Sequence, residues 1–262
     1  DKKPLTNDTV TVGGDKFVEG EGATYKVTGS QTDVGTSDNK FSYKLKDGTK
    51  AGNYNIVKAE GKLTVTADEN EIVVNIVGNT KTEKYNGKEQ SVTDYTVESI
   101  QSNGKAYSKY TEDDFSFSGT AEAKGKDAGS YNMGLKASDF ANISKNFVNV
   151  VFEVEDGQLV IEKRKVTLTS ASDEKVYDGK ALTNAQVDVG GDGFATGEGA
   201  SYDVTGSQTN VGSSDNTFTY KLNKGTKADN YDITTKEGTL KVTPETDKVT
   251  VKIKGNNDKI KY

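Results

Sequence analysis

The chain has 262 residues, with 34 Lys and Arg against 40 Asp and Glu, so its formal net charge is −6. It contains no His, no Cys and no Trp. These absences exclude disulfides, cysteine-ligated metal clusters and every catalytic device built on histidine or cysteine. The acidic balance argues against nucleic acid as a partner, and no run of about 18 apolar residues is present to insert into a membrane.

An internal repeat organises the sequence. A shift of 177 residues aligns residues 1–85 with 178–262 without a gap, and about 49 of these 85 pairs are identical. A diverged third copy lies between them, because KYNGKEQSVT at 84–93 corresponds to KVYDGKALTN at 175–184. This middle copy carries about 19 extra residues after Tyr131, and we expect residues 134–152 to form an elongated hairpin.

Alternating apolar residues predict short strands along the whole chain, and glycine pairs or Asn/Asp-Gly pairs separate them. In chain order the clearest strands are expected at 41–45, 63–65, 72–76, 150–154, 166–168 and 249–253. Turns are expected at 13–14, 47–48, 86–87, 156–157, 178–179 and 190–191. No stretch has a sustained helical period, so the prediction is an all-β chain of tandem immunoglobulin-like antiparallel β-sandwich modules.

The repeat positions predict the module boundaries. Residues 1–67 form a first repeat whose leading strand is missing, 68–163 a diverged repeat with the inserted hairpin, and 164–246 a third repeat. Residues 247–262 are expected to be a strand that continues toward a next repeat. Because open strand edges invite strand addition, this tail is expected to pair with the first unit of a neighbouring molecule or to complete its own preceding module.

A tyrosine recurs at one position of each copy, in the sequences Ala51-Gly52-Asn53-Tyr54, Asp127-Ala128-Gly129-Ser130-Tyr131 and Ala228-Asp229-Asn230-Tyr231. This pattern resembles the tyrosine corner that precedes strand F of immunoglobulin-like domains. The resemblance implies a structural role for Tyr54, Tyr131 and Tyr231, with each ring packed in the sandwich and each hydroxyl bonded to backbone.

The order Y-[DN]-G-K, G-x-x-x-[ND]-V-G, A-G-x-Y and G-x-L-x-[VI] is similar to the bacterial MBG/YDG repeat. That family occurs in tandem in large secreted surface proteins of Gram-positive and other bacteria. The resemblance implies a cell-wall-attached adhesin, in which this region is a non-catalytic extended stalk or adhesive array. No enzyme activity and no cofactor follow from it.

The alternative function is host-ligand binding by the middle repeat, with an immunoglobulin, a mucin glycan or a matrix protein as ligand. Its sequence carries more aromatic residues than the repeated scaffold needs, and interfaces are enriched in such residues. The candidate binding surface consists of Tyr107, Tyr110, Phe115, Phe140 and Phe147. The competing interpretation is that the phenylalanines cover an enlarged core.

Other sites have weaker support in the sequence. The oxygen-rich segments 35–39, 212–216 and 113–114 are typical of solvated turns, with calcium binding as the alternative. Glu21 and Glu198 recur in GEGA(T/S)Y, and paired carboxylates serve in glycoside hydrolysis, but a catalytic pair is not expected to be duplicated in one short chain. An isopeptide crosslink, common in Gram-positive surface sandwiches, is a further alternative.

Overall fold

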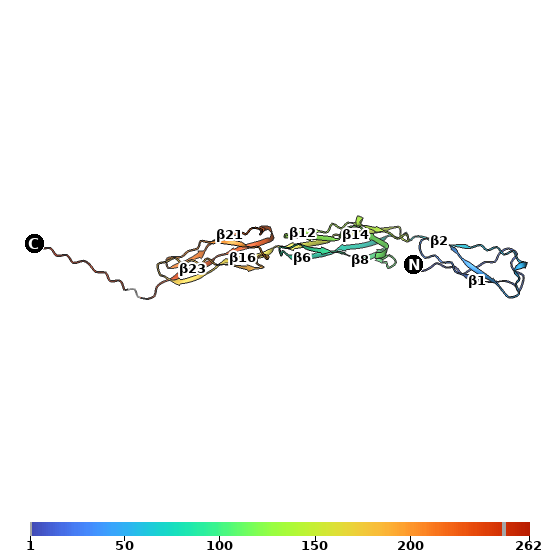
Figure 1. Cartoon of the computed structure of the whole chain (residues 1–262), viewed down its shortest axis with the longest axis horizontal. Helices are drawn as coiled ribbons and strands as arrows, with labels where there is room; N and C mark the ends of the chain where they lie inside the picture. Colours follow the sequence, from blue (N-terminus) through green and yellow to red (C-terminus); the bar gives the residue numbers. More distant parts are fainter. Residues whose placement is uncertain (1, 248–249) are drawn as a thin grey trace. The chain divides into compact units, whose positions relative to one another are not determined.

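The structure is a computed structural model that describes residues 2–247 and 250–262 (Figure 1). In these residues the regular elements are β-strands and short 3-10 helices, which confirms the predicted all-β fold. The chain divides into two compact units. Unit 1 comprises residues 1–79, 93–123 and 132–158, and unit 2 comprises residues 80–92, 124–131 and 159–262. The predicted module boundaries after residues 67, 163 and 246 stay predictions.

Two small antiparallel sheets form within residues 23–65 of unit 1. One pairs β1 (Ala23–Val27) with β3 (Phe41–Leu45), and the other pairs β2 (Gly35–Asn39) with β4 (Gly61–Val65). A 3-10 helix, η1 (Ala51–Asn53), precedes Tyr54. Segments 35–39 and 212–216, which we expected to be turns, are thus strands β2 and β20, because each completes a ladder with the G-x-L-x-V strand of its own repeat.

The core of unit 1 lies under a four-stranded sheet with the order β14-β5-β8-β9. Its strands are β14 (Val150–Glu155), β5 (Ile72–Gly78), β8 (Tyr95–Ser102) and β9 (Lys105–Ala106). Alternate residues of β5 point inward, and Ile72, Val74 and Ile76 are at most 1% exposed. Their burial follows directly from the period of two that predicted this strand.

The segment predicted as a hairpin contains 3-10 helix η3 (Ala137–Asp139), strand β13 (Phe140–Asn142) and strand β14. These two strands pair elsewhere. Strand β13 is antiparallel to β10 (Phe115–Phe117), which follows 3-10 helix η2 (Glu112–Asp114), and β14 is parallel to β5. The correction has a simple reason, since the apolar faces of both strands are covered by the core around Ile72, Val74 and Ile76, which we call the middle core, and not by each other.

Two of the three-stranded sheets in unit 2 have the orders β18-β16-β22 and β17-β23-β20. Their strands are β16 (Arg164–Ser170), β17 (Asp173–Val176), β18 (Val187–Gly191), β20 (Gly212–Asn216), β22 (Tyr231–Lys236) and β23 (Gly238–Thr243). Val166 and Leu168 of β16 and Leu240 and Val242 of β23 are buried. Each of these sheets combines one antiparallel pair with one parallel pair, and the parallel pairs are β16–β22 and β17–β23.

The remaining strands complete smaller ladders. Strands β19 (Ala200–Val204) and β21 (Phe218–Leu222) pair antiparallel, with 3-10 helix η4 (Ala228–Asn230) following them. The other ladders are β12 (Gly129–Asn132), β15 (Gln158–Glu162) and β6 (Thr80–Lys84), and β7 (Gln90–Thr93) with β11 (Glu122–Gly125). The predicted turns after Tyr85 and Tyr177 use Gly87 and Gly179, whose φ angles of 79° and 78° favour glycine.

The tail differs from its prediction as a strand. Residues 250–262 form no strand, and residues 248–249 of the predicted strand 247–262 lie outside the described residues. Val251 and Ile253 are 73% and 93% exposed. A strand needs a neighbour for its backbone groups, and the described part of the chain places none beside this segment.

Candidate functional site

The five aromatic residues predicted to form a binding surface lie in the middle core. Tyr110, Phe115, Phe140 and Phe147 are between 1% and 7% exposed, and they pack with β5. Tyr107 is partly buried and packs against the same cluster. The prediction of a binding surface is therefore corrected, because side chains sealed in a core present no area to a ligand. The extra aromatic residues enlarge the core.

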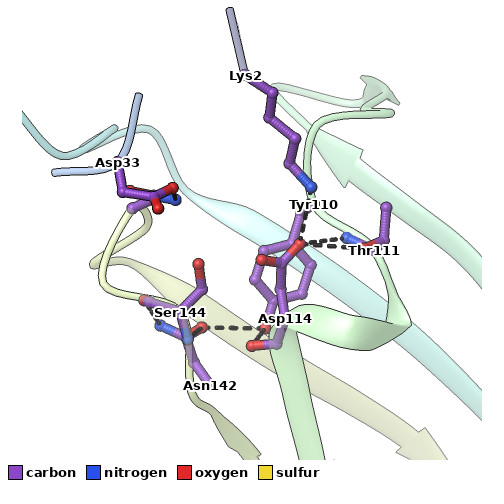
Figure 2. Close-up of polar contacts among 8 residues, drawn as sticks. Lys2, Asp33, Tyr110, Thr111, Asp114, Asn142 and Ser144 are labelled. Carbon is purple, nitrogen blue, oxygen red and sulfur yellow. Dashed lines mark hydrogen bonds and ion pairs between the residues drawn. The ribbon is translucent and has the colours of Figure 1, made fainter. Parts of the chain in front are cut away.

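A polar network around Asp114 fixes the edge of this core (Figure 2). The backbone N–H and the hydroxyl of Thr111 donate to Asp114 Oδ2 at 2.9 and 3.1 Å, and Lys2 Nζ lies 3.3 Å from the same oxygen. The Tyr110 hydroxyl lies 3.2 Å from the Asp114 carbonyl oxygen and 3.3 Å from Asn142 Oδ1. Segment 113–114 was one of the alternatives for calcium binding, and the carboxylate of Asp114 is instead hydrogen-bonded by donors of the protein.

Burial and hydrogen bonding act in opposite directions on the Asp114 carboxyl. Burial alone raises its pKa, but the hydrogen bonds from Thr111 and Ser144 and the Lys2 ammonium outweigh burial and hold the pKa below the usual value. Burial raises the pKa of the neighbouring Tyr110 to about 12. The network therefore favours a charged Asp114 beside a neutral phenol.

Two further contacts in unit 1 tie residues of the first repeat to the inserted segment. The backbone N–H of Val34 donates to Asn146 Oδ1 at 2.8 Å, and Asn146 Nδ2 donates to Asp33 Oδ1 at 3.0 Å.

The Tyr107 hydroxyl donates to Asp68 Oδ2 at 2.6 Å. Burial, with this carboxylate, raises the pKa of Tyr107 to about 12, while the hydrogen bond lowers the pKa of Asp68.

The three recurring tyrosines use two kinds of hydrogen bond. Tyr131 donates to the carbonyl oxygen of Asp127 at 2.9 Å, four residues upstream, which is the bond that a tyrosine corner makes. Tyr54 instead donates to Glu21 Oε2 at 2.6 Å and Tyr231 to Glu198 Oε2 at 2.8 Å. These two carboxylates, considered as a catalytic pair, each serve as the acceptor of a phenol from their own repeat.

Tyr54 and Tyr231 also accept hydrogen bonds from backbone. The N–H of Val18 lies 3.2 Å from the Tyr54 hydroxyl, and the N–H of Ala195 lies 3.0 Å from the Tyr231 hydroxyl. Each phenol thereby connects the loop before a G-E-G sequence to the segment that begins directly after η1 or η4. The same construction is made twice from the same residue types.

In unit 2 a second phenol joins the Glu198 site. The Tyr85 hydroxyl donates to Glu198 Oε1, the oxygen that Tyr231 does not use. The rings of Tyr85 and Tyr231 meet edge to face, with centroids 5.6 Å apart and planes at 84°. Both side chains are buried, at 2% and 4% exposure. We call the set Tyr85, Glu198 and Tyr231 the tyrosine clasp.

The electrostatics of the clasp favour neutral phenols around one carboxylate. Burial, followed by the hydrogen bond to Glu198, raises the pKa of Tyr85 far above its usual value. Burial likewise raises the pKa of Tyr231 to about 12. Both hydroxyls therefore keep the protons with which they bridge to Glu198 over the whole physiological pH range.

Charged side chains hold the backbone around the clasp. Arg164 donates from Nη1 to the Tyr85 carbonyl oxygen at 3.2 Å and from Nε to the Gly193 carbonyl oxygen at 2.7 Å. Its Nη2 donates to the Asp192 carbonyl oxygen, and Lys84 Nζ lies 2.6 Å from Asp192 Oδ1. Planar guanidinium geometry suits such a fork of acceptors.

A second polar bridge lies within the same unit. Lys227 Nζ is 2.6 Å from Asp127 Oδ2, and Asn230 Nδ2 donates to Asp127 Oδ1 at 3.0 Å. The buried Asn230 also accepts from the N–H of Ala128 at 2.7 Å. Hydrogen bonds from Lys227 and Asn230 lower the pKa of Asp127. The loop before Tyr131 is thus tied to the loop before Tyr231.

Two structural features bear on other chemistries. In the described residues no three acidic side chains converge in a group that holds a metal ion. Within residues 2–247 and 250–262, no helix is long and apolar enough to cross a membrane. The hydroxyls of Tyr85 and Tyr231 and the carboxylate of Glu198 make their hydrogen bonds with groups of this chain.

The sequence analysis did not predict the tyrosine clasp, although the sequence contains a signal for one of its bonds, the bond between Glu198 and Tyr231. Glu21 and Tyr54 are 33 residues apart, and so are Glu198 and Tyr231. A carboxylate and a phenol that recur at one spacing in two copies predict a bonded pair. Nothing in the spacing pointed to Tyr85, which is 113 residues from Glu198.

The comparisons with known proteins identify a family for part of the chain. Residues 72–163 match the family model described as MBG domain. The predicted resemblance is confirmed for these residues, which include Tyr85 but neither Glu198 nor Tyr231. Neither the curated proteins nor the solved structures gave a significant match.

Proposed function

We propose that this chain is a non-catalytic repeat region of a bacterial cell-surface protein, acting as an extended stalk or adhesive array. The tyrosine clasp carries the proposal. Tyr85 belongs to the segment that matches the MBG domain, and its hydroxyl and ring are held by Glu198 and Tyr231, which lie beyond that segment. A stalk needs such fixed connections between consecutive parts of the chain, because a flexible linker shortens the average end-to-end distance of the chain.

The clasp has the composition of a rigid contact. It combines two buried phenol rings, one shared carboxylate and the Arg164 fork to backbone. Edge-to-face aromatic pairs add to the stabilisation from burial. An acceptor shared by two buried donors is hard to displace, because each lost hydrogen bond leaves a buried polar group without a partner. The role of Glu198 in this contact also supports the absence of catalysis, since both its oxygens accept hydrogen bonds from protein.

Small-angle X-ray scattering of the full chain tests the extended stalk. A compact protein of 262 residues has a radius of gyration of about 18 Å. Three modules of about 30–40 Å in line give a rod near 100 Å long, with a radius of gyration of about 30 Å. We expect the larger value, and a value near 18 Å contradicts the proposal.

The cell-surface location is supported by the resemblance to MBG repeats and needs its own experiment. Antibodies against the purified chain are expected to label intact, unpermeabilised cells of the source bacterium. A brief treatment of the cells with external protease should remove that label while a cytoplasmic marker stays intact. Labelling that requires permeabilisation contradicts the location.

Host-ligand binding by the middle repeat is the second candidate. The burial of Tyr110, Phe115, Phe140 and Phe147 removes the residues that motivated it, but the inserted segment exposes Ile143 at 61% and Val148 at 63%. A binding role predicts that Ile143→Ser with Val148→Ser abolishes capture of mucin, matrix protein or immunoglobulin by the full chain. Equal capture by the parent and the double variant, or none by either, rejects it.

A further inference from the structure

Phenol rings are the oxidisable side chains that this chain presents to solvent. Cysteine and methionine are the usual targets of oxidants, but the chain has no cysteine, no tryptophan and a single methionine. Met133 is only 9% exposed, because it lies in the core. The tyrosines with exposed side chains are Tyr25, Tyr43, Tyr177, Tyr220 and Tyr262.

Strands β19 and β21 hold two tyrosines directly opposite each other. The antiparallel register of these strands pairs Tyr202 with Tyr220. Successive side chains of a strand alternate between its two faces, so the side chains of an opposed pair lie on the same face. Tyr220 is 39% exposed and Tyr202 is half-buried, so solvent reaches this pair.

The backbone hydrogen bonds place this pair at the closer of the two spacings in an antiparallel ladder. At one end of the ladder the Asn223 N–H donates to the Gly199 carbonyl oxygen at 2.9 Å. At the other end the Thr205 N–H donates to the Thr217 carbonyl oxygen at 2.9 Å. Hydrogen-bonded and non-hydrogen-bonded pairs alternate between these ends, and the tyrosines form a non-hydrogen-bonded pair, whose Cα atoms are about 4.5 Å apart.

The same construction occurs in unit 1. Strands β1 and β3 pair Tyr25 with Tyr43, and these side chains are 37% and 39% exposed. The Thr28 N–H donates to the Lys40 carbonyl oxygen at 2.8 Å, which makes this a non-hydrogen-bonded pair as well. The Tyr25 ring meets Phe41 edge to face with centroids 6.4 Å apart, so it lies over the face that Tyr43 shares. We call the pairs Tyr202–Tyr220 and Tyr25–Tyr43 the opposed pairs.

Access distinguishes the opposed pairs from other tyrosines. Within residues 2–247 and 250–262, no protein group hydrogen-bonds a hydroxyl of the opposed pairs. The clasp rings of Tyr85 and Tyr231 are also close, but they are buried, meet edge to face and bond to Glu198. Tyr177 has the opposite combination, since it is 42% exposed and lies beside Thr243 instead of a tyrosine.

We propose that the opposed pairs are sites of oxidative crosslinking, at which hydrogen peroxide and a haem peroxidase join the two tyrosines of each pair as dityrosine. The oxidant removes the O–H hydrogen atom from each phenol, and the peroxide is reduced to two water molecules. The two phenoxyl radicals form one carbon–carbon bond between ring carbons that neighbour the hydroxyl groups. The hydrogen atom on each joined carbon then moves to the oxygen, which restores both phenols.

A dityrosine braces thin parts of the fold. The sheets β1–β3 and β19–β21 contain two strands each, and two-stranded sheets are only marginally stable by themselves. A covalent bridge between strands restricts the unfolded chain as a disulfide does, and this chain has no cysteine with which to form a disulfide. The chemistry needs only an oxidant, so it stands apart from the cell-surface function proposed above.

Peptide mass spectrometry of the oxidised chain tests the crosslinks. The full chain is treated with hydrogen peroxide and a haem peroxidase at low protein concentration and then cleaved before aspartate. This cleavage separates the two tyrosines of each opposed pair into different peptides, which are 192–202 and 215–228 in unit 2 and 15–32 and 38–46 in unit 1. We expect both pairs of peptides to be joined, each with the loss of two hydrogen atoms and with dityrosine fluorescence.

The other tyrosines supply the internal controls. Peptides that carry Tyr85 and Tyr231 should stay unjoined, because these rings are close but buried. Tyr177 should rarely be joined to another tyrosine, because it is exposed without an opposed partner. Joining of Tyr85 to Tyr231, or joining of Tyr177 as often as the opposed pairs, overturns the proposal. So does extensive loss of tyrosine without joining of either opposed pair.

An isotope mixture decides whether each link forms within one molecule. Equal amounts of ordinary and nitrogen-15 chains are oxidised together, and the joined peptides should be either wholly labelled or wholly unlabelled. Oxidation of the same mixture in denaturant should lose the preference for the opposed pairs, because the strand register is lost. Joined peptides of mixed labelling as the main product, or the same pattern in denaturant, overturn the assignment to the folded ribbons.

Thermal unfolding tests the bracing effect. Oxidation of the parent should raise its unfolding temperature by about 5 °C. The double variant Tyr43→Phe with Tyr220→Phe keeps the ring packing but removes one phenol from each opposed pair, so the same treatment should leave its unfolding temperature unchanged. Tyr177→Phe is the matched control and should respond like the parent. An oxidised, crosslinked parent with no gain over the double variant contradicts the bracing role.

Discussion

The ring of Tyr85 packs edge to face against the ring of Tyr231, with the two centroids 5.6 Å apart. The two tyrosines are far apart in sequence, and only the first lies in the segment that matches the MBG domain. Glu198 links them because each hydroxyl donates to a different oxygen of its carboxylate. Each tyrosine belongs to a recurring motif that could be explained within its own repeat. Through Glu198 and the ring contact, the two tyrosines instead connect consecutive parts of the chain.

Replacing Glu198 with alanine should destabilise unit 2. The variant Glu198→Ala leaves two buried phenol hydroxyls without their acceptor, which costs about 2–4 kcal/mol. Hydrogen exchange of amides in β16 and β22 reports the free energy of opening locally, without assuming that the whole chain unfolds in one step. The matched control is Glu21→Ala, which removes the acceptor of one half-buried phenol, Tyr54. A larger loss in the control contradicts the shared-acceptor account.

The hydroxyl of Tyr85 should contribute separately from its ring. The variant Tyr85→Phe keeps the edge-to-face packing but removes one charge-assisted hydrogen bond, with an expected loss of about 1–2 kcal/mol. Tyr85→Ala also empties a buried site, with an expected loss of about 3–5 kcal/mol. Chemical denaturation followed by tyrosine fluorescence measures both. The control Tyr220→Phe changes an exposed tyrosine and should be neutral, and a Tyr85→Phe variant as stable as that control contradicts the prediction.

Stability should fall steeply in alkali. Burial raises the pKa of Tyr107, Tyr110 and Tyr231 to about 12, so the folded chain retains these protons while the unfolded chain releases them near pH 10. Their contribution is fully present below pH 10 and is lost as the pH rises from 10 toward 12. Absorbance of tyrosinate and far-UV circular dichroism, followed together, should show late ionisation coupled to unfolding. Ionisation of all 13 tyrosines near pH 10 in a folded chain contradicts it.

Aromatic residues of the middle core should act through stability. Phe140→Ala removes a ring that is 5% exposed and packs against Tyr95, Phe115 and Phe152, with an expected cost of about 3–5 kcal/mol. Thermal unfolding checks this directly. The control Val148→Ala changes a side chain that is 63% exposed in the same inserted segment and should have little effect. Similar unfolding temperatures for the two variants contradict the assignment of Phe140 to the core.

Much of the fold could be predicted from the sequence because local alternation decides which residues of a strand are buried. Ile72, Val74 and Ile76 alternate in sequence and are buried in the structure. The aromatic surface was wrong for the complementary reason. Alternation places Phe115 and Phe117 on the same side of their strand, but it carries no information about which other strands cover that side.

The candidate site shows the same limit more sharply. The bond between Glu198 and Tyr231 had a signal in two repeats, because the same spacing occurs for Glu21 and Tyr54. The partner Tyr85 had none, since its contact depends on how loops that are distant in sequence meet. Segments 35–39 and 212–216 were expected to be turns from their Ser, Asp and Asn content, but pairing with β4 and β23 overrides that preference.

The account depends most on a stiff connection through the tyrosine clasp, and the absence of cysteine allows its direct measurement. Spin labels at Thr82→Cys and Lys221→Cys, both exposed positions of unit 2, give a distance distribution by pulsed electron paramagnetic resonance. We predict one narrow distribution for the labelled parent and a broad one after Glu198→Ala is added. A distribution that is already broad in the parent, or that is unchanged by Glu198→Ala, would contradict the clasp as the connection.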